Sequence, residues 1–334
     1  MTPRTPVSPR EPLPTVIPRA PGSVRRTMSV DIGARRGFSA ALAMTGLARD
    51  LGTGSDGPDD VTVLAEATVA AGFDAARELV SLETTPAATW AHDLIGARAG
   101  GGFRRHLATV VPEADAGSLL RQVLDDMPAA ALISGYAWMR LARREGHDPS
   151  SLMPANLLER MSDLCSGWRT GGEAVASIET HHGMPIQDCP PSPVDRSDRW
   201  GWHAMEPLDR DWMRRRRCLD VTVDDAGSFS IWAMFRDTVG EEDGAEVVLH
   251  EYAVTASGVG TTVGAIAAEP RVLPFSECPA AALAVGDLVG CQLAELSRSV
   301  PELLTGIRSC THLNDLLRAL GGVADLVAGF SKGP

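Results

Sequence analysis

The chain has few aromatic residues and no long hydrophobic run. Aromatic side chains make up 5% of its 334 residues, so the core must consist mostly of alanine, valine and leucine. No apolar run approaches the roughly 18–20 residues of a membrane helix, and we expect no membrane partner. The first residues also lack the apolar stretch and cleavage site of a secretory signal, so we expect a cytoplasmic protein.

The charge balance is acidic. The chain carries 31 basic and 43 acidic side chains, for a formal net charge of -12. Such an excess disfavours nucleic acid and anionic lipid surfaces as partners. The 44% hydrophobic and 22% charged content is ordinary for a globular protein, and the length suits two domains or one large one.

The chain has six cysteines. In a reducing compartment they are unlikely to form a disulfide framework. Each is then either a small buried residue or a functional thiol.

Segments in the first half resemble segments roughly 190 residues later, in the same order. The matching pairs are 25–32 with 216–223, 48–57 with 235–244, 63–69 with 248–254, 85–96 with 278–290, and 118–124 with 315–321. This order predicts an internal duplication. A repeat of this kind determines the architecture of the whole fold.

Each copy reads as an antiparallel sheet followed by helices, which is an α+β unit. In the second copy, alternating segments flank an Asp-Asp-Ala-Gly turn, and Thr311 is a candidate N-cap for a last helix. We therefore predict a disordered proline-rich tail over 1–24, a degenerate first copy over 25–145, a linker with a short helix and a tryptophan-rich crossing over 146–213, and a second copy over 214–330.

At four aligned positions the second copy has cysteine or histidine where the first copy has neither. These are His250, Cys278, Cys310 and His312. Thiolates and imidazoles form a tetrahedral zinc shell, so we predict a metal site from these four residues, with zinc as the ion and iron or an iron–sulfur cluster as alternatives. Two metal-free interpretations remain: buried structural residues, or a thiol and imidazole pair that acts as nucleophile or acid/base.

Further residues are candidates for catalysis and substrate binding. His250 could also act as the acid or base, with Tyr252 as its companion two positions along the strand. Glu251 is a possible base, but neighbouring residues on a strand point to opposite faces unless a bulge intervenes. Trp200, Trp202 and Arg236 are candidates for binding the substrate.

Two polar clusters have open roles. The adjacent His181 and His182 lie in a turn-rich stretch, where histidines are more often solvated than ligating. The basic run at 214–217 is either a solvated or acid-paired face, or an anion site.

The chain resembles a bacterial domain-of-unknown-function family with a C-terminal CTHL motif. The resemblance rests on ARDL, GGFRRHL, LDDMPAAALISGYA, RRRRCLDV, the FRD and HEY pair, ECPAA and CTHLNDLLRAL. It covers nearly the whole chain after the proline-rich tail and implies no established activity.

The second copy also resembles the iron–sulfur cluster assembly scaffold fold. That resemblance implies His250 at a strand position, Cys278 after the last strand, and Cys310 with His312 at a late pair. Here the strand cysteine of the family is a histidine, and its His-Cys pair is Cys-Thr-His. These departures favour a mononuclear ion over a cluster.

Three functions stay open. The first is a metal-dependent lyase, hydrolase or cyclase that acts on a small organic substrate between the two copies. The second is a non-catalytic metal or iron–sulfur carrier, or a module with a structural ion. The third is a metal-free enzyme that uses the cleft between the copies. The copies would form a pseudo-dimer within one chain, and a homo-oligomer is also possible.

Overall fold

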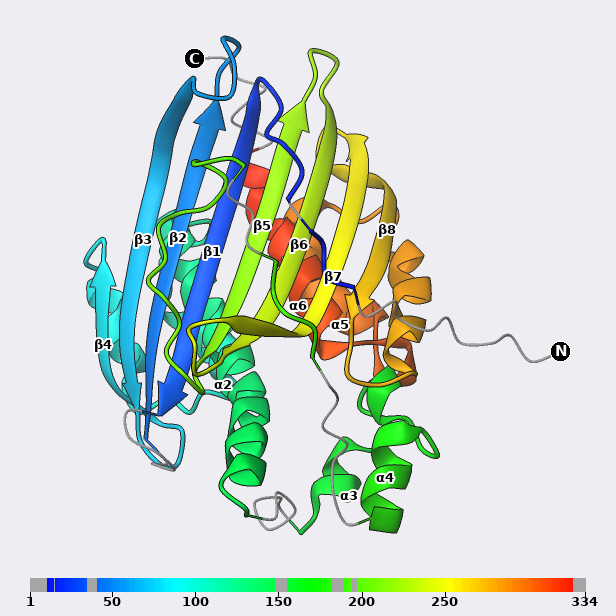
Figure 1. The fold of residues 1–334 in the computed structure, drawn as a ribbon. Coiled ribbons are helices and arrows are strands. Elements are labelled where there is room, and N and C mark those ends of the chain that lie inside the picture. Colours follow the sequence, from blue (N-terminus) through cyan, green and yellow to red (C-terminus); the bar gives the residue numbers. More distant parts are fainter. Residues whose placement is uncertain are drawn as a thin grey trace, which may run out of the picture.

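The structure is a computed structural model, and it describes residues 11–14, 16–34, 41–147, 155–181, 189–193 and 197–326. One eight-stranded antiparallel sheet carries helices on one of its faces (Figure 1). The α+β class expected from the sequence is thus confirmed. No helix among the described residues is long and apolar enough to cross a bilayer.

The sheet consists of two four-stranded meanders that pair through their first strands. The strand order is β4-β3-β2-β1-β5-β6-β7-β8, and β1 runs antiparallel to β5 at the centre. The strands are β1 (Ser23–Ala34), β2 (Leu42–Thr53), β3 (Val61–Phe73), β4 (Leu79–Thr85), β5 (Met213–Val223), β6 (Ser228–Gly240), β7 (Glu246–Val259) and β8 (Thr262–Val272).

Helices follow each meander and pack on the same face of the sheet, which we call the helical face (Figure 1). The first set is η1 (Thr89–Leu94), α1 (Phe103–Val110), η2 (Glu113–Asp115) and α2 (Leu119–Arg144). The second is η5 (Cys278–Leu288), η6 (Leu293–Glu295), α5 (Leu296–Leu303), η7 (Gly306–Arg308), α6 (Thr311–Ala319) and η8 (Leu320–Val323). Along the chain, the two meanders with their helices are connected by a segment that contains α3 (Leu157–Met161), η4 (Ser166–Trp168) and α4 (Glu173–His181).

Local signals in the second half predicted its strands well. The Asp-Asp-Ala-Gly turn joins β5 to β6, because Asp224 Oδ1 accepts from the backbone N–H groups of Ala226 and Ser228. The last helix differs in detail from the prediction. Cys310, not Thr311, is the N-cap residue of α6, and its side chain makes no capping hydrogen bond.

Part of the predicted disordered tail lies against the face of the sheet opposite the helices. The guanidinium of Arg236 donates to the carbonyl of Leu13 at 2.6 Å, and Arg25 donates to the carbonyl of Ile17 at 2.5 Å. Buried arginines thus satisfy the backbone that proline-rich sequence leaves without regular partners. Residues 1–10 lie outside the described residues.

The segment before β5, over 197–212, crosses the same opposite face in front of β1 (Figure 1). Gly33 of β1 marks the closeness of this packing, because a Cβ at that position would lie 2.4 Å from the Trp212 ring. The segment over 197–212 therefore covers part of this face of the sheet.

Two hydrophobic cores fill the helical face, one under each meander. The first packs Phe73, Leu79 and their neighbours against α1 and α2, and the second packs Phe229 and Tyr252 against the C-terminal helices. Between the cores lies a group of charged side chains that we call the central ion-pair cluster: Arg26, Asp50, Arg104, Asp125, Asp126, Arg215, Arg217, Asp237, Asp315 and Arg318.

The replacement of Asp126 by alanine is expected to destabilise the fold strongly. Asp126 accepts from Arg217 at 2.6 Å, and both side chains are almost fully buried. The variant leaves a buried guanidinium without its partner, which costs about 3–5 kcal/mol. Urea unfolding followed by tryptophan fluorescence measures the loss.

Glu302→Ala is the control for Asp126→Ala. Glu302 pairs with Arg298 at 3.7 Å on the surface, so its removal should change stability by less than about 1 kcal/mol. Equal losses in the two variants would contradict the importance of the buried pair.

Candidate metal centre

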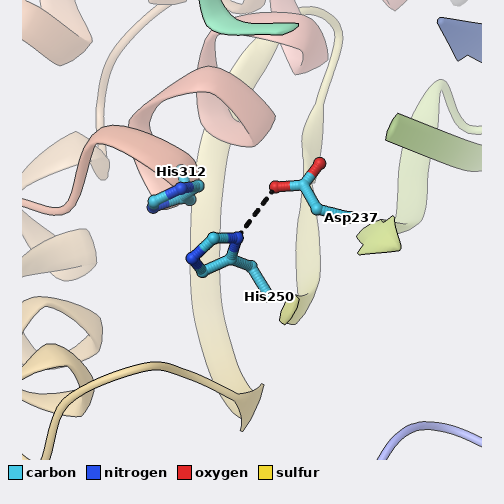
Figure 2. A group of neighbouring side chains, drawn as sticks. All are labelled: Asp237, His250 and His312. Atoms are coloured by element: carbon cyan, nitrogen blue, oxygen red, sulfur yellow. Dashed lines mark ion pairs between the residues drawn. The ribbon is translucent and has the colours of Figure 1, made fainter. Parts of the chain in front are cut away.

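Three side chains of the second half come together on the helical face: Asp237 of β6, His250 of β7 and His312 of α6 (Figure 2). Asp237 and His250 are direct neighbours across the two strands. The register shifts immediately after Asp237, so a β-bulge adjoins the site. His312 reaches the same place from the first turn of α6.

The three side chains are close and mostly buried. His250 Nδ1 lies 3.3 Å from Asp237 Oδ2, and both residues are 0% exposed (Figure 2). The rings of His250 and His312 stack, with centroids 3.9 Å apart. One ligand atom from each residue lies within 4.8 Å of the others. Among the described residues, this is the group of three potential metal-ligating side chains whose ligand atoms all lie this close together.

The surroundings of the site keep Asp237 ionised and His312 neutral. Burial alone would raise the pKa of Asp237, but the Arg215 charge, the adjacent His250 and the hydrogen bonds from Arg215 outweigh it and hold the pKa well below its usual range. Burial, followed by the nearby His250, lowers the pKa of His312 well below its usual value. Ionised carboxylate and neutral imidazole are the forms that bind metals.

The ring nitrogens of His250 lack hydrogen-bond partners. Its Nδ1 lies 3.3 Å from Asp237 Oδ2, but neither Nδ1 nor Nε2 has a hydrogen-bond partner in the described part of the chain. The ring of Tyr136, from α2, meets the imidazole edge-on at 5.0 Å. The imidazole therefore has an unsatisfied nitrogen with which to bind an ion.

The structure separates the four predicted metal ligands. His250 and His312 adjoin, and Cys310 Sγ lies 3.8 Å from His312 Nδ1. Cys278 starts η5 and is buried in the second core, and neither cysteine belongs to the three-residue group. Burial, followed by the neighbouring Cys165, raises the pKa of Cys310 to about 12, which keeps its thiol protonated.

Sequence reasoning missed Asp237 as a site residue. The adjacent Arg236 and Asp237 suggest a simple salt bridge, but their side chains point to opposite faces of β6. Asp237 pairs with Arg215 at 2.8 Å, whereas Arg236 pairs with Glu251 on the other face. The recurrence of the same dipeptide at Arg49-Asp50 was the available signal.

The other candidate catalytic residues do not join the group. Tyr252 is buried on the helical face and donates from its hydroxyl to the Cys278 carbonyl at 3.0 Å. Glu251 points away from His250, since it accepts from Arg236 and from the Leu13 N–H. The β-bulges do not bring Glu251 to the face that carries His250.

The predicted substrate-binding residues lie across the sheet from His250. The carbonyl of Trp200 accepts from Arg49 at 2.6 Å, Trp202 packs edge-on against His203, and Arg236 is tied to Glu251. All three belong to the face opposite the helices. The sheet therefore separates these three candidates from His250, because Arg236 points to the other face of β6 and residues 197–212 cross that same face (Figure 1).

Of the two adjacent histidines in the linker, His181 ends α4 and His182 lies outside the described residues. Any role for this pair stays a prediction.

His203 is buried in the opposite face and is fully bonded. Its Nε2 lies 2.7 Å from Ser29 Oγ and its Nδ1 lies 2.9 Å from Thr27 Oγ1. Burial, followed by the charges of Arg49 and Arg214, lowers its pKa to about 4. His203 thus stays neutral near pH 7 and serves as a structural histidine.

The depressed pKa of His203 predicts a loss of stability in acid. The unfolded chain takes up a proton near pH 6.5 but the folded one only near pH 4, so stability is present above 6.5 and falls as the pH drops toward 4. The full difference is about 3 kcal/mol. Urea unfolding of wild type and His203→Gln at pH 7, 5.5 and 4 should show a shallower decline in the variant. Parallel declines would contradict the assignment.

Comparisons with known proteins match only the second half. Residues 213–325 match the family described as "Protein of unknown function (DUF2889)". The match runs from β5 to beyond α6 and contains Asp237, His250 and His312. It agrees with the resemblance to a domain-of-unknown-function family. No curated protein and no solved structure matches the chain.

Proposed function

We propose that this protein holds one divalent metal ion at Asp237, His250 and His312. Two imidazoles and one carboxylate are a ligand set that zinc and iron(II) accept. The unpartnered ring nitrogens of His250, which is fully buried, carry the proposal. A buried polar atom without a partner is costly, and an ion in this place would satisfy it.

The surroundings of the three residues support the same proposal. Asp237 is ionised and His312 is neutral, so neither must lose a proton to bind an ion. Arg215 bonds Asp237 through two nitrogens, at 2.8 and 3.0 Å, and so fixes the orientation of the carboxylate. Such outer contacts set the direction in which a ligand points.

We further propose that the ion serves a hydrolase, lyase or cyclase reaction on a small organic molecule. A metal with an open position polarises a carbonyl group or a bound water. The carrier or structural alternative requires a closed shell, for which Cys310 is the nearest further donor, 3.8 Å from His312. The metal-free alternative uses the Asp237–His250 pair as an acid/base dyad.

Metal analysis tests the site itself. The full-length protein, loaded with zinc, cobalt(II) or anaerobic iron(II) and then desalted, should retain about one equivalent of one of these ions. Asp237→Asn, His250→Gln and His312→Gln should each lose most of it, because each removes one of only three ligands. Inductively coupled plasma mass spectrometry measures the content, and circular dichroism checks that the variants fold.

His203→Gln is the matched control, since it removes another buried histidine with no part in the group. The metal proposal fails if the wild type retains none of the three ions, or if the three site variants retain as much as this control. An absorbance spectrum of an iron–sulfur cluster would instead support the scaffold resemblance.

The cobalt(II) form distinguishes enzyme from carrier. An open position should bind azide and change the visible absorption bands of the ion. Unchanged bands would indicate a closed shell and would favour the carrier or structural role.

We also propose that the two meanders arose by duplication. The β-bulge after Asp237 has a counterpart after Asp50, and Asp50 pairs with Arg26 as Asp237 pairs with Arg215. In this comparison Arg26 corresponds to Arg215, whereas the sequence match pairs Arg26 with Arg217, two positions later. An experimental structure in which 23–85 and 213–272 fail to superpose would refute this origin.

A further inference from the structure

A polar cavity opens on the helical face where the two halves meet. It has a volume of about 250 Å³ and lies between the first turns of α2 and the C-terminal helices. Its charged and amide walls are Arg121, Gln122, Asp125, Arg217, Asp315 and Arg318. None of the three candidate metal ligands lines it, so the cavity is separate from the site already described.

The cavity has cationic donors without partners. Arg217 is only 4% exposed and gives one terminal nitrogen to Asp126, but its Nε has no hydrogen-bond partner among the described residues. The buried Nε of Arg318 is also unpartnered among the described residues, although its terminal nitrogens donate to the Ser297 carbonyl at 2.7 Å and pair with Asp125 at 3.4 Å. Arg121 has no ion pair with any described residue. An unpartnered buried donor is costly, so these atoms indicate a ligand with acceptor oxygens.

The acidic walls are already bonded. Asp315 accepts from Arg104 at 2.8 Å and from Arg215 at 3.1 Å, and Asp125 pairs with Arg104 at 3.2 Å. Asp325 is exposed at the rim, where water solvates it. Asp125 and Asp315 thus have cationic partners, whereas the Nε atoms of Arg217 and Arg318 have no hydrogen-bond partner among the described residues, and neither does Asp126 Oδ2 beside Arg217.

We propose that this cavity binds a small oxyanion, either a short carboxylate or a phosphate group, through Arg121, Arg217 and Arg318. Guanidinium groups match the oxygens of carboxylate and phosphate with paired hydrogen bonds. A volume of about 250 Å³ is enough for a compact anion. The proposal goes beyond the metal site and does not depend on it.

Calorimetric titration of the full-length protein with inorganic phosphate and, separately, with succinate tests the proposal. One of the two probes should bind saturably, and the arm that responds identifies the oxyanion type. Arg121→Gln removes a donor and Ala319→Leu fills the cavity, so each should weaken binding at least tenfold. Arg105→Gln, which removes an exposed arginine of α1 away from the cavity, should bind as the wild type does.

Absence of saturable binding of both probes to the wild type would overturn the proposal. Equal binding by wild type and Ala319→Leu would do the same, because the ion would then be adventitious. Arg217 is left intact, since its loss would also leave Asp126 unpaired in the interior. The same titration of His250→Gln should give unchanged affinity, which separates this result from failure of the metal proposal.

Discussion

The buried ion pair between Arg215 and Asp237 connects the parts of this structure. Arg215 is 2% exposed and Asp237 is 0% exposed, so neither charge is solvated. The same guanidinium reaches Asp315 of α6 at 3.1 Å, and the same carboxylate faces His250 at 3.3 Å. Removing one partner of a buried ion pair destabilises a protein far more than replacing the whole pair with apolar residues. The sheet, the last helix and the candidate site therefore depend on one another.

The chain builds this interior with arginine, which supplies all but one of its basic residues. A guanidinium has a planar fork that bonds a carboxylate through two nitrogens, which an ammonium group cannot do. Along β5 the basic run alternates between faces: Arg214 and Arg216 pair with Glu246, whereas Arg215 and Arg217 pair with Asp237 and Asp126. The basic run is therefore acid-paired. Because these ion pairs are largely buried, both faces of β5 are covered by other parts of the chain.

The candidate metal centre and the oxyanion cavity lie on one network of charges. Asp315 lines the cavity, and through Arg215 it is one ion pair from Asp237. The two hydrophobic cores flank this network on either side. On the helical face, this network connects α2 and α6 with β5 and β6.

The sequence by itself determined the local elements: the alternation and turn chemistry of β5 to β8, the opposite directions of His250 and Glu251, and the enrichment of histidine and cysteine near the site. Tertiary structure alone decided that β1 pairs with β5 in one sheet, that Asp237 stands beside His250, and that Cys278 stays apart. Periodicity specifies which face a side chain takes, because it acts between near neighbours. It does not specify the pairing of strands almost two hundred residues apart, which depends on how helices and segments cover the two faces.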